Sequence, residues 1–207
     1  MQELGRLLVK QSLIPRRYLK ATLAELTNVD VKHINKAREW VTIAALTGSS
    51  GVFIQAEPRG IGKTHLAVCL MKGLALTGRI NRQMTFFSFI DLLEVMAEWG
   101  DKYSDHQYST WARRIDNSEV VLLDDLAPVG KLNIVLEQQA YRLIDLLYSQ
   151  ERCVIVTSNA NLGQVAKLYG EAGWAMASRL TEMCPNVWDL TQKGGTKDDF
   201  RLKGGKK

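Results

Sequence analysis

A glycine-rich segment that ends in lysine and threonine offers the most specific chemistry in the sequence. Gly60-Ile61-Gly62-Lys63-Thr64 stands between an apolar run at 52–54 and a segment with helical periodicity. Glycines let the backbone curl so that N–H groups converge on an anion, and a following helix directs its positive end there. We predict a phosphate-binding loop in which Lys63 reaches the β- and γ-phosphates and the hydroxyl of Thr64 holds magnesium.

One position departs from the usual pattern of such a loop. The pattern asks for a glycine four spacer residues before the Gly-Lys pair, and Glu57 stands there instead. A carboxylate at the entrance of the loop would repel phosphate, which leaves the strength of nucleotide binding open. The alternative interpretation is a turn that merely begins a helix, and the strand–loop–helix context argues against it.

Two adjacent carboxylates follow the most apolar run of the chain. Val120-Val121-Leu122-Leu123 is typical of a strand covered on both faces, and Asp124-Asp125 comes directly after it. Asp124 would bind magnesium, directly or through water, while Asp125 would polarise an attacking water molecule. The alternative is a solvated turn, and the phosphate loop upstream favours the catalytic interpretation.

A polar amide follows the next apolar run. Val154-Ile155-Val156 is followed by Thr157-Ser158-Asn159. If this strand lies beside the one that ends at Asp124, Asn159 can orient a water molecule near the γ-phosphate. A Ser-Asn turn after a strand is common, so the order of the motifs along the chain supports this interpretation more than the residue itself.

The elements that must position these residues alternate along the chain. Short apolar runs at 52–54, 84–89, 120–123, 154–156 and 187–190 predict five strands, and helical patterns at 31–46, 66–74, 90–99 and 135–148 lie before or between them. Strands that alternate with helices favour an α/β fold with a parallel sheet and right-handed crossovers. We expect a helical N-terminal segment at 1–46, a core at 47–192 and a basic tail at 193–207.

Composition excludes several classes of protein. The chain has 207 residues, 46% of them hydrophobic, which is too apolar for a disordered protein, and no apolar run is long enough to span a membrane. Its net charge of +5 comes from residues 1–20 and 193–207, because the stretch between them holds 16 basic and 19 acidic residues. The three cysteines and three histidines are scattered, so we expect neither disulfides nor a zinc site, and a reduced, cytoplasmic setting.

These motifs together resemble the AAA+ ATPases of the DnaC-type helicase-loader group, which includes DnaI and the IstB transposition helpers. The similarity covers nearly the whole chain in the right order. It rests on Ile14-Pro15-Arg16-Arg17-Tyr18, Gly62-Lys63-Thr64-His65-Leu66-Ala67, Leu123-Asp124-Asp125-Leu126, Thr157-Ser158-Asn159, Ser178-Arg179-Leu180 and Asp199-Phe200-Arg201, the last resembling the family's Asp-Tyr-Arg.

The resemblance implies a P-loop NTPase fold: a three-layer sandwich around a central parallel five-stranded sheet, without a helical lid domain. It implies ATP and Mg²⁺ as ligands and adds His65 to the nucleotide-binding residues. Arg179 would be an arginine finger acting on the neighbouring subunit of a ring or helical oligomer. The alternative for Arg179 is a surface salt bridge, for example with Glu182.

The function that the resemblance implies is ATP-dependent loading or remodelling of a replicative helicase on single-stranded DNA, with ATP hydrolysed at subunit interfaces. One alternative is an IstB-like regulator of transposition, whose partner is a transposase and whose target is duplex DNA. Another is a nucleotide-binding scaffold with little turnover. Two features suggest it: Glu57 in the loop, and Asp125 where a glutamate is commoner.

A basic and aromatic cluster between the second and third predicted strands is the candidate DNA surface. Single strands are held by cations and by aromatic rings on which bases stack. Lys102, Tyr103, Arg113 and Arg114 are the candidates, with Trp99, Tyr108 and Trp111 nearby. The alternative, equally supported by the sequence, is that the aromatic side chains pack this region against the sheet.

Overall fold

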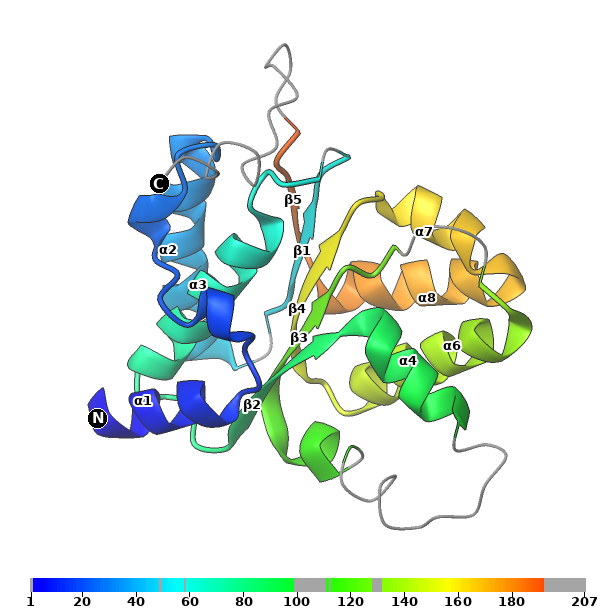
Figure 1. Cartoon of the computed structure of the whole chain (residues 1–207), viewed down its shortest axis with the longest axis horizontal. Coiled ribbons are helices and arrows are strands. Elements are labelled where there is room, and N and C mark those ends of the chain that lie inside the picture. Colours follow the sequence, from blue (N-terminus) through cyan, green and yellow to red (C-terminus); the bar gives the residue numbers. More distant parts are fainter. Residues whose placement is uncertain are drawn as a thin grey trace.

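Five parallel strands form a sheet that divides the molecule into three layers (Figure 1). The structure, a computed structural model, describes residues 2–48, 50–57, 59–98, 111, 113–127 and 132–191. The strand order is β2-β3-β4-β1-β5. The strands are β1 Val52–Gln55, β2 Gln83–Ser88, β3 Ser118–Asp124, β4 Cys153–Ser158 and β5 Asn186–Asp189. The predicted five-stranded parallel sheet is confirmed, with strand ends shifted by at most a few residues.

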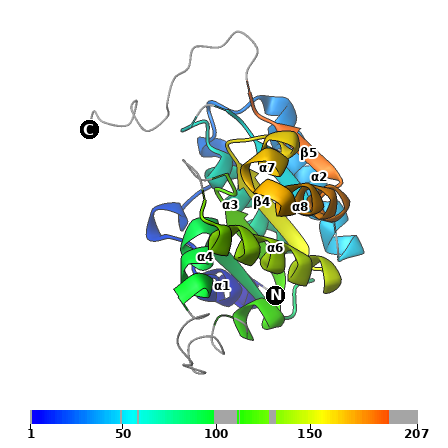
Figure 2. The same cartoon turned by 90° about the vertical axis from the view of Figure 1, so that its right-hand side faces the viewer.

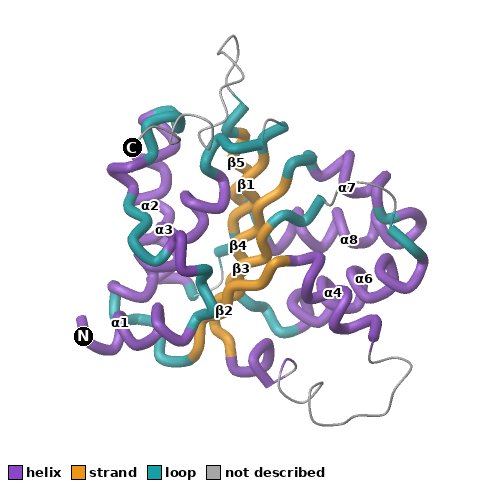
Figure 3. Tube along the Cα trace, in the orientation of Figure 1, coloured by secondary structure: helices purple, strands orange, loops and turns teal. Residues whose placement is uncertain are grey.

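Helices cover both faces of the sheet. α1, α2 and α3 lie on one face, and α4, α6, α7 and α8 lie on the other (Figures 1 and 3). Short 3₁₀ turns, η1 and η2, join α1 to α2. The bounds are α1 Gln2–Gln11, η1 Arg16–Tyr18, η2 Leu23–Glu25, α2 Val31–Thr47, α3 Lys63–Leu76, α4 Phe89–Glu98, α6 Ile134–Ser149, α7 Leu162–Leu168 and α8 Gly170–Met183.

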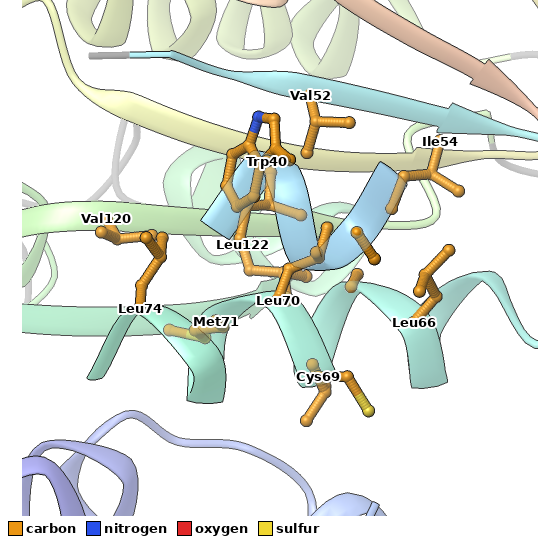
Figure 4. Packing of buried hydrophobic residues seen from close by; sticks show 14 of the residues in the cluster. Trp40, Val52, Ile54, Leu66, Cys69, Leu70, Met71, Leu74, Val120 and Leu122 are labelled. Atoms are coloured by element: carbon orange, nitrogen blue, oxygen red, sulfur yellow. The ribbon is translucent and has the colours of Figure 1, made fainter. Parts of the chain in front are cut away.

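The apolar strands have buried residues on both faces, as their sequences predict. Val120 and Leu122 of β3 belong to the core under α2 and α3, whereas Val121 and Leu123 belong to the core under α4, α6 and α8. Figure 4 shows Leu66, Leu70 and Leu74 of α3, with Trp40 of α2, between these helices and the strands. On the opposite face α6 and α8 pack against each other (Figure 2).

The N-terminal segment shares the core of the sheet domain. Leu8, Ile14, Ala21 and Trp40 belong to the same hydrophobic cluster as β1 and α3. α1 crosses α3 so closely that a Cβ added at Gly5 would lie 2.7 Å from the carbonyl oxygen of Ala75. The division of the chain at residue 46 stays a prediction, and the predicted tail at 193–207 lies outside the described residues.

Parallel strands bring all five carboxyl ends to one edge of the sheet. Leu123 of β3 is in register with Val156 of β4, so the residues that follow each of them are neighbours. Gln55, the last residue of β1, is in register with Ser158. This edge gathers the residues after β1, β3 and β4, which are the segments where the sequence predicts chemistry. Among the described helices, none is long and apolar enough to cross a membrane.

Candidate active site

A cavity of about 390 Å³ opens at the carboxyl edge of the sheet. Its volume lies within the range of small-molecule sites in proteins. Three parts of the chain line it: the segment before α2, the glycine-rich loop with the start of α3, and the ends of β3 and β4. The lining residues are Arg17, Tyr18, Arg59, Gly60, Gly62, Lys63, Thr64, His65, Asp124, Asp125, Thr157 and Asn159.

The predicted phosphate loop has the backbone that its glycines allow. Gly60 and Gly62 have φ of 79° and 107°, a region that favours glycine, and α3 begins at Lys63. Lys63 is buried, and its Nζ donates a hydrogen bond of 3.0 Å to the carbonyl oxygen of Ala56. The side chain of Ile61, predicted as part of the loop, packs against the hydrophobic core. The loop therefore presents backbone and the first residues of α3 to the cavity.

Glu57 lies outside the lining of this cavity. Its side chain is exposed and borders a neighbouring cavity of about 210 Å³, together with Asn161 and Asp189. The carboxylate is therefore not among the groups that face the predicted phosphate site. The two cavities share Asn159, and the effect of Glu57 on nucleotide binding stays a prediction.

Asp124 is held by two hydroxyl groups. Its Oδ1 accepts hydrogen bonds from Thr64 Oγ1 at 2.8 Å and from Thr157 Oγ1 at 2.7 Å. Burial raises the pKa of Asp124, and the two hydroxyl bonds oppose this, as does the charge of Arg17; the neighbouring carboxylate of Asp125 adds to the rise. An ionised, partly buried carboxylate of this kind is stabilised further by a cation placed beside it.

Asp125 and Asn159 meet at the mouth of the cavity. Asn159 Nδ2 donates a short hydrogen bond to Asp125 Oδ1. Asp125 has φ of 61°, a left-handed conformation that aspartate tolerates better than most residues, and its N–H donates to Thr157 Oγ1 at 2.9 Å. Thr157 thus bonds to both aspartates. Sequence reasoning singled out Asn159 from the Thr-Ser-Asn run and missed Thr157, whose role depends on the register of β3 and β4.

The donor set fits magnesium. The hydroxyl of Thr64 and the carboxylate of Asp124 are adjacent, and both are oxygen ligands of the kind that Mg²⁺ binds. Within the described ranges no three residues of the His, Cys, Asp and Glu types converge as a metal site. Mg²⁺ bound with substrate phosphates needs only one or two protein oxygens, because water and phosphate supply the rest.

The N-terminal segment reaches the cavity with residues that had no predicted role. Arg17 and Tyr18 line it, although sequence reasoning used them only as part of a family motif. His65, predicted as a nucleotide contact, does line the cavity, and its Nε2 lies 2.8 Å from the carbonyl oxygen of Thr22. One ring nitrogen of His65 therefore joins the N-terminal segment to the start of α3.

A family model for IstB-like ATP binding proteins matches residues 25–195. The chain belongs to this family. The match includes the glycine-rich loop, both aspartates and Asn159, which are the residues gathered at the cavity. The predicted IstB-like family is confirmed, and the protein is an ATP-binding protein of this family.

Solved structures share the fold of this IstB-like protein. A DnaC helicase loader is 24% identical with a TM-score of 0.68, and the alignment covers 86% of this chain and 100% of that one. DnaI is 17% identical with a TM-score of 0.66, covering 92% and 99%. DnaA from Aquifex aeolicus, bound to AMPPCP, is 20% identical with a TM-score of 0.60, covering 83% and 50%. No curated protein matches the chain. At these identities the likeness establishes the P-loop NTPase fold.

Arg179 of the IstB-like protein lies on α8, outside the lining of its own cavity. Its Nε lies 2.9 Å from Asp145 Oδ1 and forms an ion pair with it, although this nitrogen makes no hydrogen bond in the described residues. Its Nη2 donates a hydrogen bond of 3.0 Å to the hydroxyl of Tyr141. The guanidinium also lies 4.9 Å from the Tyr141 ring centroid. The salt-bridge partner is Asp145 and not Glu182, which instead accepts a hydrogen bond from Tyr148.

The candidate DNA residues are only partly described. Lys102 and Tyr103, like Trp99 and Tyr108, lie outside the described residues. Arg113 is exposed, and Arg114 is half-buried with an Nη1 that has no hydrogen-bond partner in the described part of the chain. The ring of Trp111 lies 5.6 Å from that of Phe87 on β2, so this aromatic side chain packs against the sheet.

Proposed function

We propose that this IstB-like protein hydrolyses ATP with Mg²⁺ at the cavity, to ADP and phosphate. The observation that carries the proposal is the hydrogen-bonded chain that runs from the first turn of α3 to the ends of β3 and β4. In it Thr64 and Thr157 hold Asp124, and Thr157 and Asn159 hold Asp125. These groups border the part of the cavity in which the terminal phosphates would lie, above the glycine-rich loop.

Each residue then has a definite task. Backbone N–H groups of the loop and the ammonium of Lys63 bind the β- and γ-phosphates, with Lys63 exchanging its bond to Ala56. Thr64 and Asp124 would hold Mg²⁺, which would supply positive charge against the phosphates. Asp125 accepts the proton of the attacking water, whose oxygen bonds to the γ-phosphorus while the bond to ADP breaks. Asn159 orients Asp125 and this water molecule.

We propose further that Arg179 completes the site of a neighbouring copy in a ring or helical assembly. Its place on α8, away from the cavity of its own chain, supports action in trans. The same helix exposes Trp174, a large aromatic residue with 66% of its surface accessible. Exposed aromatic and arginine side chains are the types most enriched at protein interfaces. A head-to-tail interface that includes α8 would deliver Arg179.

The proposed task is the loading or remodelling of a replicative helicase on single-stranded DNA. Its support is the shared fold with structures described as a DnaC helicase loader, DnaI and a replication initiator DnaA bound to AMPPCP and single-stranded DNA. The family description, IstB-like ATP binding protein, favours a second candidate, an ATPase that regulates transposition through a transposase. Either partner would place the protein in the cytoplasm with the DNA.

The experiment is an ATPase assay with and without single-stranded or duplex DNA, and with a candidate helicase or transposase. Lys63→Ala and Asp125→Ala should each abolish turnover, while Lys36→Ala, a change at an exposed cation on α2, should not. Unchanged turnover in either site variant would refute the assigned site. Stimulation by single strands with the helicase supports loading, and stimulation by duplex with the transposase supports the second function. Absence of turnover under all conditions would favour the third interpretation, a nucleotide-binding scaffold.

A mixing experiment tests Arg179. Lys63→Ala subunits keep the arginine, and Arg179→Ala subunits keep the loop, so a mixed assembly contains some interfaces with both groups intact. Each variant alone should be inactive, and their mixture should regain a fraction of the wild-type rate. If the mixture stays inactive, or if Arg179→Ala alone retains turnover when assembled, the role in trans is wrong.

A further inference from the structure

A short segment before α2 forms one wall of the nucleotide cavity. We call residues 15–26 the N-terminal arm; it contains η1, which begins after Pro15, and η2. Within it the N–H of Tyr18 donates to the carbonyl oxygen of Pro15 at 2.8 Å, and that of Ala21 to Tyr18 at 3.0 Å. These bonds give a fixed turn, which directs Arg17 and Tyr18 into the lining of the cavity.

The N-terminal arm is fastened to α3 along its length. Lys72 Nζ donates to the carbonyl oxygens of Leu19 at 2.9 Å and Ala21 at 2.7 Å, and His65 Nε2 lies 2.8 Å from that of Thr22. At the loop itself, a Cβ added to Gly62 would lie 3.0 Å from Leu26 Cδ2. Since three carbonyl groups of the arm are bound by side chains of one helix, the arm and the phosphate loop form one unit.

Arg17 is a cation without an anionic partner in this wall. Its side chain is exposed, and in the described ranges no carboxylate oxygen lies within ion-pair distance of it. The guanidinium lies 4.7 Å from the ring centroid of Tyr18, which orients it by a cation–π contact. Arg17 nevertheless faces the active site, because it lines the same cavity as Lys63 and Asp124.

We propose that Arg17 binds the terminal phosphate of ATP bound to its own chain, and that the N-terminal arm thereby distinguishes ATP from ADP. The inference rests on the proposed ATP binding at this cavity. It assigns the γ-phosphate because Arg17 lines the same cavity as Thr64 and Asp124, which are joined by a hydrogen bond and mark the β,γ end of the site.

Charge balance in the cavity supports this role. Asp124 and Asp125 line the cavity beside the position of the terminal phosphates and repel them, while Lys63 at the floor of the loop and Arg59 are the other lysine and arginine in the described lining. A guanidinium with five donors in one plane suits a phosphate with several free oxygens. Arg17 is solvated, and in the described residues it forms no ion pair. It can therefore bind the γ-phosphate without first breaking a salt bridge within the protein.

The test compares Arg17→Ala with Arg16→Ala in the full-length chain. Arg16 is the matched control, since it is an exposed arginine in the same turn and does not line the cavity. Titration calorimetry with ATP and with ADP, both with Mg²⁺, gives the dissociation constants. We expect Arg17→Ala to weaken ATP binding by about tenfold, the worth of one solvated charge-assisted contact, and ADP binding by less than about twofold. Arg17→Lys should recover part of the loss.

Two results would overturn the proposal. One is an ATP affinity in Arg17→Ala equal to that of Arg16→Ala. The other is an equal loss for ATP and ADP, which would mean that Arg17 only holds the arm in place or contacts another part of the nucleotide. Failure of the proposed hydrolysis looks different, since the wild-type chain would then bind ATP without turning it over. Failure of nucleotide binding at this cavity would show as a wild-type affinity that Lys63→Ala leaves unchanged.

Discussion

Thr157 is the residue on which the arrangement of both aspartates depends. Its hydroxyl donates to Asp124 Oδ1 at 2.7 Å and accepts from the N–H of Asp125 at 2.9 Å, and the residue is only 1% exposed. Thr157→Val keeps the shape of the side chain and removes both bonds. We expect this substitution to destabilise the nucleotide-free protein and to displace the carboxylates.

The expected magnitude follows from the two bonds. A hydrogen bond to a charged group contributes about 1.5–3 kcal/mol, and a buried N–H left without a partner costs about 1–3 kcal/mol. Because the cavity admits water that can replace part of each bond, we take the lower half of the range and expect a loss of about 3 kcal/mol. For a domain of this size that corresponds to about 6–12 °C in the thermal midpoint.

The assay is urea unfolding followed by circular dichroism, without nucleotide, at neutral pH and through a series of lower pH values. Burial already holds the pKa of Asp124 above its usual value, and losing the Thr157 hydroxyl bond raises it further. The penalty of an ionised Asp124 is present above its folded-state pKa and fades as the pH falls through it. The deficit of Thr157→Val should therefore shrink at the lower pH.

Thr157→Ser is the control, because serine keeps the hydroxyl and removes one buried methyl group, at a cost of about 1 kcal/mol. If Thr157→Val lies within about 0.5 kcal/mol of the wild type, the two bonds contribute nothing to stability and the reasoning fails. It also fails if the serine and valine variants lose the same amount, since the hydroxyl would then be irrelevant.

Three further substitutions test other parts of the structure. Asp124→Asn should abolish ATPase activity yet raise the melting temperature of the nucleotide-free protein at neutral pH, because burial disfavours the charge. Calorimetry at falling pH should show this gain disappear as the wild-type carboxyl becomes protonated. Gly173→Ala should cost about 2–3 kcal/mol in urea unfolding, because its Cβ would lie 2.1 Å from the carbonyl oxygen of Ala166. Gly163→Ala in α7 is the matched control; its Cβ would lie 3.4 Å from Asn161 Oδ1, and the change should be neutral or stabilising. Glu57→Gln should leave the dissociation constant of ATP within about twofold of the wild-type value, and a gain of about tenfold would mean that the carboxylate does repel phosphate.

Local patterns in the sequence determined the elements and the identity of most site residues. Unbroken apolar runs predicted β3 and β4, because a strand buried on both faces must be apolar at every position. The glycines, Lys63 and Thr64 predicted the phosphate loop, because few other residue types allow φ of 79° and 107° before a helix. Since parallel strands end at one edge, the order of the motifs also predicted that Asn159 would follow a strand beside the one that ends at Asp124.

Tertiary structure alone decided which groups share a bond or a cavity. Asp124 and Thr157 are joined because Leu123 is in register with Val156, and a shift of β4 by one residue would turn Thr157 to the opposite face of the sheet. Arg17 reaches the cavity because the N-terminal arm is fastened to α3 by Lys72 and His65. These contacts join residues that are more than 30 positions apart in the chain, as the bond from Thr157 to Asp124 does. They depend on strand register and helix packing, which the periodicity of a local sequence does not specify.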